Sequence, residues 1–358
     1  MVKLRYCLLV FLLTFLISCD GKKEPIALPT GFFSLQDSIL DPLSTTFSSV
    51  GDKVIYSSWD TLVNIFDVSV NEFILKYKLK DICYAKPLLD TISKRLFVPF
   101  SNREFICLDV NTQDTIWSIN INGRCGGFEL VNDSILVINE KDYGITALNA
   151  NNGEKVYELR YDSEICIPDL SPYYINSDTK YLYISDWLCK DLITYDLFTG
   201  KKLWEFSNKE SYALGDVIVI DSLLFIGGNR FYNGGKLWIM NKYDQSIKNE
   251  FELNYQPRED PILYDNYIFF YCYKGNEDFG KISVFDINNQ TINEVKSLSS
   301  PEIRLSGHQM YLAGDYNYYS NSNRKTMQIN CKTLEFSVLL EDLYIFYAFE
   351  YNGITYLM

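Results

Sequence analysis

The stretch Tyr-Asp-Leu-Phe-Thr-Gly-Lys-Lys-Leu-Trp-Glu-Phe, residues 195–206, contains the pattern that decides the fold. An apolar strand ends where Asp196 begins a short polar turn, and a second strand follows the turn directly. The Asp side chain can accept a hydrogen bond from the backbone two residues further on, and Gly200 tolerates a positive φ. Alternation with a period of two places Trp204 on the face of the second strand opposite to Glu205. The stretch therefore predicts a β-hairpin.

The same pattern recurs along almost the whole chain. Seven Asp or Asn residues end an apolar strand and begin a polar turn: Asp67, Asp109, Asn149, Asp196, Asn241, Asp286 and Asn330. Successive positions are 40 to 47 residues apart. A repeat of about 40–50 residues with about four strands per unit is typical of a β-propeller. We therefore predict an all-β fold, a single β-propeller of four-stranded antiparallel blades.

Both ends of the chain contain further strand patterns. Residues 344–349 and 354–357 have the pattern of two strands after the seventh repeat, and residues 32–35 have the pattern of one strand before the first repeat. A ring closed by strands from both termini has no exposed sheet edge, which would otherwise invite aggregation. The pattern favours eight blades closed in this way, with seven blades as the alternative.

The first nineteen residues have the layout of a secretory signal. Lys3 and Arg5 precede an apolar run over residues 7–17, which is shorter than the roughly 20 residues of a membrane-spanning helix. The following Ser18-Cys19 closely resembles the lipobox of bacterial lipoproteins, which implies lipidation of Cys19 and an outer-membrane anchor in the cell envelope. Both a periplasmic and a surface-facing position fit this signal. The predicted domains are a signal peptide (1–18), a lipidated N-terminus with a flexible tether (19–30) and the propeller (31–358).

The charge and cysteine content of the chain limit the partners and the disulfides that we expect. The chain has 33 Lys and Arg against 46 Asp and Glu, a formal net charge of −13. Because such a surface repels phosphate backbones, we expect no nucleic-acid partner. Of nine cysteines, Cys7 leaves with the signal peptide and Cys19 carries lipid. The other seven show no disulfide framework and are interpreted as small apolar strand residues, with a pair between Cys166 and Cys189 as the alternative.

Three repeats carry a family resemblance. Residues 108–119, 148–159 and 195–206 resemble the repeat of pyrroloquinoline-quinone-type propellers, and the resemblance extends over about residues 40–340. It implies that Trp117 and Trp204, at matching outer-strand positions, are buried against a neighbouring blade. The family includes quinoprotein dehydrogenases and the propeller lipoprotein of the outer-membrane barrel-assembly machinery. The dehydrogenases carry a vicinal disulfide, and some a Cys-x-x-Cys-His haem motif. Neither pattern occurs in this chain, so we expect no cofactor.

One face of the predicted ring carries the candidate binding residues. Loops between the second and third strands open on the same face as loops from an outer strand to the next inner strand. The candidates on these loops are aromatic or basic: Trp59, Arg124, Tyr143, Trp187, Arg230, Phe231, Tyr232, Arg258, Tyr316 and Tyr319. Such anchors supply most of the binding energy of protein interfaces. The alternative is that Trp59 and Trp187 only fill gaps between blades.

No catalytic or metal site is predicted, because His308 is the single histidine and stands outside any nucleophile motif. We therefore predict an exported, membrane-anchored, monomeric lipoprotein that is a non-catalytic binding or scaffold module for a protein or glycan. The alternatives are a barrel-assembly-type accessory lipoprotein and a propeller enzyme that uses loop carboxylates.

Overall fold

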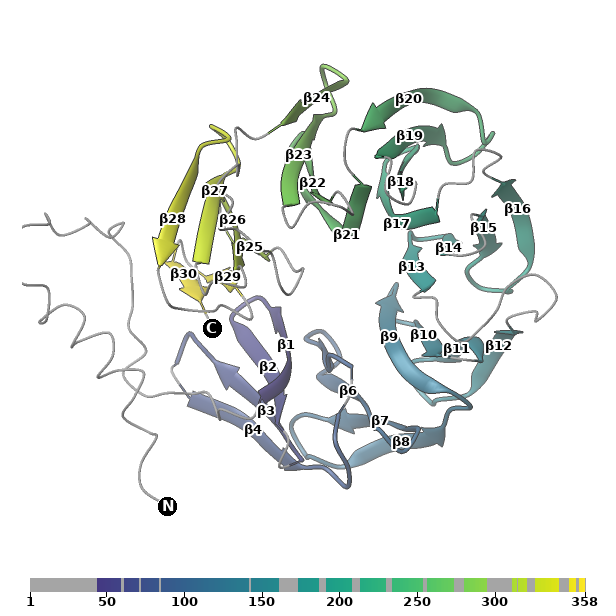
Figure 1. Ribbon diagram of the computed structural model, residues 1–358. Coiled ribbons are helices and arrows are strands. Elements are labelled where there is room, and N and C mark those ends of the chain that lie inside the picture. The colour runs from purple at the N-terminus through teal and green to yellow at the C-terminus, as the bar shows by residue number, and fades with distance from the viewer. Residues whose placement is uncertain are drawn as a thin grey trace, which may run out of the picture.

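The fold of the described residues is built from β-strands alone. The computed structural model describes residues 44–58, 61–70, 72–83, 85–141, 143–160, 173–186, 191–207, 213–229, 234–253, 256–273, 280–294, 311–313, 315–320, 326–340, 348–351 and 354–357. In Figure 1 the strands form small sheets that follow one another around a ring. The predicted all-β class is confirmed. No helix in these residues is long and apolar enough to cross a membrane.

The first four sheets, or blades, each contain four antiparallel strands in sequence order. Blade one comprises β1 (Ser44–Val50), β2 (Lys53–Ser58), β3 (Leu62–Asp67) and β4 (Glu72–Lys78). Blade two comprises β5 (Leu88–Asp90), β6 (Arg95–Pro99), β7 (Glu104–Asp109) and β8 (Thr115–Asn120). Blade three comprises β9 (Arg124–Val131), β10 (Ile135–Lys141), β11 (Gly144–Asn149) and β12 (Lys155–Arg160). Blade four comprises β13 (Tyr173–Ser177), β14 (Tyr181–Asp186), β15 (Asp191–Asp196) and β16 (Lys202–Ser207).

Three further four-stranded blades and one smaller sheet follow. Blade five comprises β17 (Ala213–Ile220), β18 (Leu223–Asn229), β19 (Gly235–Asn241) and β20 (Ile247–Leu253). Blade six comprises β21 (Gln256–Tyr264), β22 (Tyr267–Tyr273), β23 (Gly280–Asp286) and β24 (Thr291–Glu294). Blade seven comprises β25 (Tyr311–Ala313), β26 (Tyr316–Ser320), β27 (Thr326–Asn330) and β28 (Phe336–Leu340). The smaller sheet pairs β29 (Ala348–Tyr351) with β30 (Ile354–Leu357).

The small sheet of β29 and β30 follows blade seven, at the point where the ring must close. Its strand β29 contacts β25, as the first strands of neighbouring blades do elsewhere in the ring. The predicted strand over residues 354–357 is β30, and the described end of the predicted strand 344–349 lies in β29. Residues 32–35 lie outside the described residues. Closure by an N-terminal strand, and with it the choice between eight and seven blades, stays a prediction.

All seven predicted turn residues begin the turn between the third and fourth strands of a blade. Asp109 Oδ1 accepts hydrogen bonds from the backbone N–H groups of Asn111 (2.8 Å) and Thr112 (3.0 Å). The other six Asp or Asn residues accept an equivalent bond. The fifth residue of the turn has a positive φ in the six blades where it is described: Gln113, Gly153, Gly200, Gln245, Gln290 and Leu334. The repeated Asp or Asn is thus a turn residue, as predicted.

A second hydrogen bond ties this turn to the turn between the first and second strands of the same blade. The residue that follows each Asp or Asn donates its backbone N–H across the blade, at 2.8–2.9 Å in all seven cases. The pairs are Val68 to Asp52, Val110 to Lys94, Ala150 to Ser134, Leu197 to Lys180, Lys242 to Ser222, Ile287 to Asn266 and Cys331 to Asp315. The two turns at this end of every blade therefore form one hydrogen-bonded unit.

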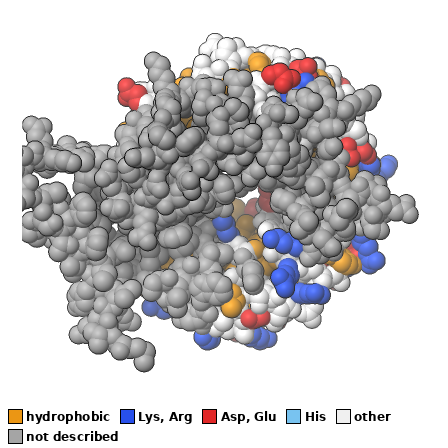
Figure 2. Space-filling model, viewed as in Figure 1, with side chains coloured by type: hydrophobic (Ala, Val, Ile, Leu, Met, Phe, Trp, Pro, Cys, Tyr) orange, Lys and Arg blue, Asp and Glu red, His pale blue; other side chains and the backbone are white. Residues whose placement is uncertain are grey.

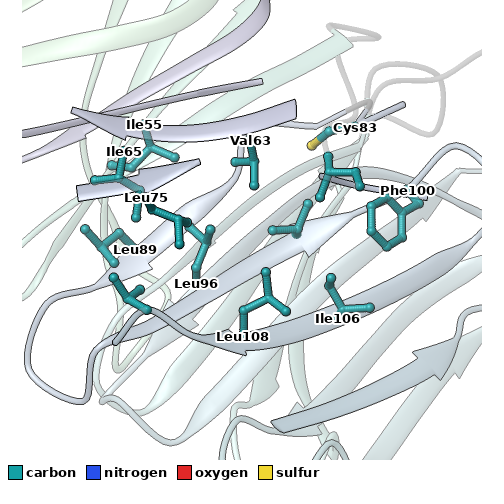
Figure 3. Packing of buried hydrophobic residues seen from close by; sticks show 13 residues of the cluster. Ile55, Val63, Ile65, Leu75, Cys83, Leu89, Leu96, Phe100, Ile106 and Leu108 are labelled. Carbon is teal, nitrogen blue, oxygen red and sulfur yellow. The ribbon is translucent and has the colours of Figure 1, made fainter. Parts of the chain in front are cut away.

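The hydrophobic core lies between the blades. Six clusters of buried apolar side chains correspond to the six contacts between consecutive four-stranded blades. Figure 3 shows the first cluster, in which Ile65 and Leu75 of blade one face Leu96 and Leu108 of blade two. Five of the cysteines are buried and form no disulfide, in agreement with their interpretation as apolar residues: Cys83, Cys107, Cys125, Cys272 and Cys331. Cys166 and Cys189 lie outside the described residues.

An aromatic residue on the fourth strand packs against the turn of the next blade. Trp117 of β8 is 8% exposed, and its indole N–H donates to the carbonyl oxygen of Ala150 at 3.0 Å. A Cβ atom added to Gly153 would lie 2.9 Å from the Trp117 ring. The same relation holds one blade later, because a Cβ on Gly200 would lie 2.6 Å from the Tyr157 ring. Glycine is required at each of these two positions for two reasons: the backbone φ is positive, and an aromatic ring lies where a Cβ atom would be.

The expectation that Trp204 is buried like Trp117 is wrong. Trp204 of β16 is half-buried and lies at the edge of the cluster between blades four and five. The turn of the next blade has Gln245, with φ 62°, at the position that Gly153 holds under Trp117. We attribute the smaller burial of Trp204 to the loss of the glycine at this position.

We predict that Trp117→Ala lowers the free energy of unfolding by about 3–5 kcal/mol, the range for deleting a large aromatic side chain from a core. Trp117→Phe keeps most of the packing but loses the hydrogen bond to Ala150, which costs about 1 kcal/mol plus a small cavity term. Trp204→Ala should cost clearly less than Trp117→Ala. Urea denaturation of the three variants measures these differences, and equal losses at the two tryptophans would contradict the packing described.

Candidate functional site

The blades have two chemically different ends. The turn face carries the turns between the first and second strands and between the third and fourth strands. The loop face carries the loops between the second and third strands, together with the loops that lead to the next blade. The candidate residues were predicted on the loop face. Whether a side chain is available for binding therefore depends first on the face that it occupies.

Several polar side chains on the turn face make contacts between blades. Arg95 is buried and pairs with Asp90 at 2.9 Å within blade two. The same guanidinium donates to Asn151 Oδ1 (2.7 Å) and to the carbonyl oxygen of Asp133 (3.0 Å) in blade three. Further ties between blades are Asn132 to Thr179, Lys242 to Asp178, Asn249 to Gln290, and Tyr264 to Asp315. These polar groups stabilise the ring, and the turn face also exposes apolar side chains, among them Val70, Ile92 and Tyr243.

Only part of the predicted site is described. Trp59, Trp187, Arg230, Phe231 and Tyr232 lie outside the described residues. The backbones of Arg258 and Tyr319 are part of β21 and β26, and nothing is described of their side chains. The three predicted site residues whose side chains are described are Arg124, Tyr143 and Tyr316.

Tyr316 does not belong with the other candidates, and its predicted place on the loop face is wrong. It begins β26 and pairs with Ala313 and Asn330, beside the turn that contains Asp315. That turn accepts the hydrogen bond from Cys331, so it lies on the turn face. The run from Asp315 to Tyr319 is therefore a turn and a strand. It is not a loop between a second and a third strand.

Tyr143 lies on the loop face but is already engaged. Its hydroxyl donates to Glu158 at 2.7 Å, and the Arg160 guanidinium lies over its ring at 5.4 Å. Hydrogen bonds donated by Lys155, Arg160 and Tyr143 lower the pKa of Glu158 to about 2. The hydrogen bond to the Glu158 carboxylate in turn raises the pKa of Tyr143. The ring is half-buried, and its hydroxyl is directed toward the outer strand β12.

Arg124 is exposed at the start of β9, directly after the loop that leads into blade three. A fully buried carboxylate fixes this loop. Glu140 Oε2 accepts hydrogen bonds from the backbone N–H groups of Asn122 (2.6 Å) and Gly123 (2.7 Å). A Cβ added to Gly123 would lie 2.4 Å from the Lys141 carbonyl oxygen, so only glycine allows the loop to lie this close to β10. Arg124 thus projects from a constrained backbone.

Two more cations adjoin Arg124, and sequence reasoning missed both. Lys141 pairs with Arg124 across β9 and β10, and its aliphatic chain lies over Gly126. Arg103, with φ 73°, donates to the carbonyl oxygen of Asn122 at 2.9 Å. Neither residue stands in the repeated pattern. The one available signal is the glycine-rich run around Cys125, which allows close approach of neighbouring side chains.

The inner strand β9 also carries a carboxyl group with a perturbed pKa. Burial raises the pKa of Glu129, and the nearby Ser177 hydroxyl of β13 partly opposes the rise. The Ser177 hydroxyl lies near this carboxyl group but makes no hydrogen bond among the described residues. A Cβ added to Gly127 would meet nothing within 4 Å, so β9 borders open space there.

Comparisons with known proteins agree with this architecture. A family model described as outer membrane protein assembly factor BamB matches residues 91–212. The crystal structure of BamB from Moraxella catarrhalis is similar over 87% of this chain and 90% of that chain, with a TM-score of 0.65 and 13% identity. The chain has the β-propeller fold, and residues 91–212 match the model of this propeller family. A comparison with curated protein sequences finds no relative.

Other propellers with different roles share the fold. The crystal structure of the computationally designed Ika8 protein is similar over 88% of this chain and 92% of that chain, with a TM-score of 0.65 and 10% identity. Dihydro-heme d1 dehydrogenase NirN, in complex with DHE, is similar over 82% of this chain and 66% of that chain, with a TM-score of 0.60 and 14% identity. A fold shared by an assembly factor, a designed protein and an enzyme does not decide function.

We predict that Glu129→Gln stabilises the propeller at pH 7 relative to wild type, and that the gain disappears as the pH falls. The folded-state pKa of Glu129 lies above its ordinary value of 4.5, so the folded protein holds this proton to a higher pH than the unfolded chain. Wild-type stability therefore falls as the pH rises between the unfolded and folded pKa values, and the loss persists at neutral pH. Gln, which does not titrate, lacks this loss. Urea denaturation of both proteins at pH 4 and pH 7 is the measurement, and an unchanged difference would refute the burial of this carboxyl group.

Proposed function

We propose that this propeller is a protein-binding scaffold of the cell envelope and that its loop face receives the partner. The observation that carries the proposal is the contrast between the faces. Several polar turn-face side chains join neighbouring blades, whereas the loop face of blades two and three presents exposed cations on a constrained backbone. Rigid elements that display exposed side chains are the usual basis of a binding surface. A glycan would be the alternative ligand for the same face.

A more specific role as a barrel-assembly accessory is a second candidate. The match of residues 91–212 to the BamB family model favours it, because this segment includes the loop that carries Arg124. The likeness to the Moraxella catarrhalis protein supports the fold, and at 13% identity it does not support a particular partner. An envelope scaffold is common to both candidates.

The scaffold proposal predicts which face touches a partner in the cell. We would place a benzophenone amino acid at exposed loop-face positions, Lys86 and Asn120, and at exposed turn-face positions, Asn111 and Lys201. Irradiation of cells that produce the protein should give discrete protein adducts from the first pair and not from the second. Adducts from the turn face alone, or none from any position, would refute the proposal.

Membrane anchoring through Cys19 is a further proposal, which rests on the lipobox of the sequence. Cys19→Ala should abolish incorporation of radiolabelled palmitate and move the protein from the detergent phase to the aqueous phase, because the lipid thioether can no longer form. Cys83→Ala, at a buried cysteine of the propeller, is the matched control and should keep the label. Unchanged labelling and partitioning of the Cys19 variant would show that this residue is not the anchor.

A further inference from the structure

We propose that the loop-face rim of blades two and three binds an acidic, extended segment of the partner protein through the side chains of Arg103, Arg124 and Lys141. These three residues are the cationic rim. The inference deepens the scaffold function and rests on it. All three side chains are exposed, and they surround one loop, residues 121–123.

The cationic rim has no ion pair within the described residues. Other exposed cations of the same face do make one, as Arg160 does with Glu158 at 2.7 Å. Lys141 stands directly opposite Arg124 in the register of β9 and β10. Like charges at opposed positions of neighbouring strands are destabilising. An external anion would relieve this repulsion.

The backbone that presents the rim is held in place before any partner arrives. Glu140 fixes the loop through two short hydrogen bonds, and Arg103 braces it from blade two. The Lys141 chain lies over Gly126, with its Cγ and Cε atoms 3.0 and 3.1 Å from the position of an added Cβ, so it runs along the inner strand. Preorganisation of this kind lowers the entropy lost on binding.

The occupied backbone amides indicate the kind of anion. A compact anion such as phosphate is commonly held by consecutive backbone N–H groups in a turn. Here the two candidate amides, of Asn122 and Gly123, already donate to Glu140. Only long, separate side chains remain to bind the ligand. Carboxylates spaced along an extended peptide fit such an arrangement better than one compact phosphate.

The overall charge of the chain does not oppose this local attraction. Figure 2 shows Lys and Arg side chains gathered beside the central hollow, over the second and third blades. The formal net charge of −13 is spread over the whole molecule. At physiological ionic strength charges are screened beyond about 8 Å. Contacts at the rim therefore decide whether an acidic segment binds, and the surrounding acidity limits binding elsewhere.

The test uses the full chain and a fluorescein-labelled decaglutamate peptide, followed by fluorescence anisotropy at 50 mM and 200 mM NaCl. Arg124→Glu/Lys141→Glu should weaken peptide binding at least tenfold. Lys94→Glu/Lys201→Glu changes the net charge equally on the turn face, where both lysines are exposed, and should leave the Kd within twofold of wild type. Equal weakening in both double variants would overturn the proposal. A second result would also overturn the proposal. In that case the protein does not bind the peptide but binds vesicles that contain phosphatidylglycerol, or heparin, and Arg124→Glu/Lys141→Glu weakens that binding.

A third variant tests the positioning role of Glu140. Glu140→Ala removes the acceptor of both backbone hydrogen bonds, so hydrogen exchange at the amides of residues 122 and 123 should accelerate and the peptide Kd should rise. Faster exchange with an unchanged Kd would show a purely structural role and would count against preorganisation of the rim.

The two proposals fail in different ways. The proposal for the cationic rim fails if wild type does not bind the peptide and the loop-face adducts persist unchanged in Arg124→Glu/Lys141→Glu. The scaffold proposal would survive that result. Peptide binding that depends on the rim, without any loop-face adduct in cells, would refute the scaffold.

Discussion

The pairing of two turns at one end of every blade is the constraint on which the molecule depends. An Asp or Asn side chain closes the turn before the fourth strand, and the next residue donates its N–H to the turn between the first two strands. This contact repeats in all seven four-stranded blades at 2.8–2.9 Å. It sets the relative height of the four strands. It also presents a turn of fixed shape to the preceding blade, and Trp117 and Tyr157 pack against two of these turns.

The paired turns stabilise the ring at one end of the blades, so the loops at the other end can vary for binding. Because the turns are fixed within each blade, their side chains can join neighbouring blades, as Arg95 does from blade two to blade three. Among the described residues, a comparable tie at the opposite end occurs in blades one and two alone, from Leu79 to Thr61 and from Ile121 to Arg103. The loops at this end differ from blade to blade, and the loop beside Arg124 is held by the carboxylate of Glu140 and by Arg103. Variation in sequence at this end can alter binding without loss of the ring.

Repetition explains how much could be predicted from the sequence. The seven Asp and Asn residues, the strands beside them and the burial of Trp117 follow from a pattern with a fixed period. Tyr316 was misplaced because Asp315 resembles a loop residue, whereas its carbonyl oxygen accepts the bond from Cys331. The burial of Trp204 was overestimated because it depends on Gln245 in the next blade. The contact of Glu140 with residues 122 and 123 joins segments outside the repeat, and only three-dimensional proximity reveals it.

The most direct test of this account is hydrogen exchange of the free, full-length chain at the seven amides that join the paired turns, including those of Val110, Ala150 and Leu197. Buried hydrogen bonds that hold a structural unit together exchange only when that unit opens. The account predicts that these amides exchange as slowly as those in the middle of the strands, and that they lose protection together with the strands under mild denaturant. Rapid exchange at the paired turns while the strands stay protected would contradict it.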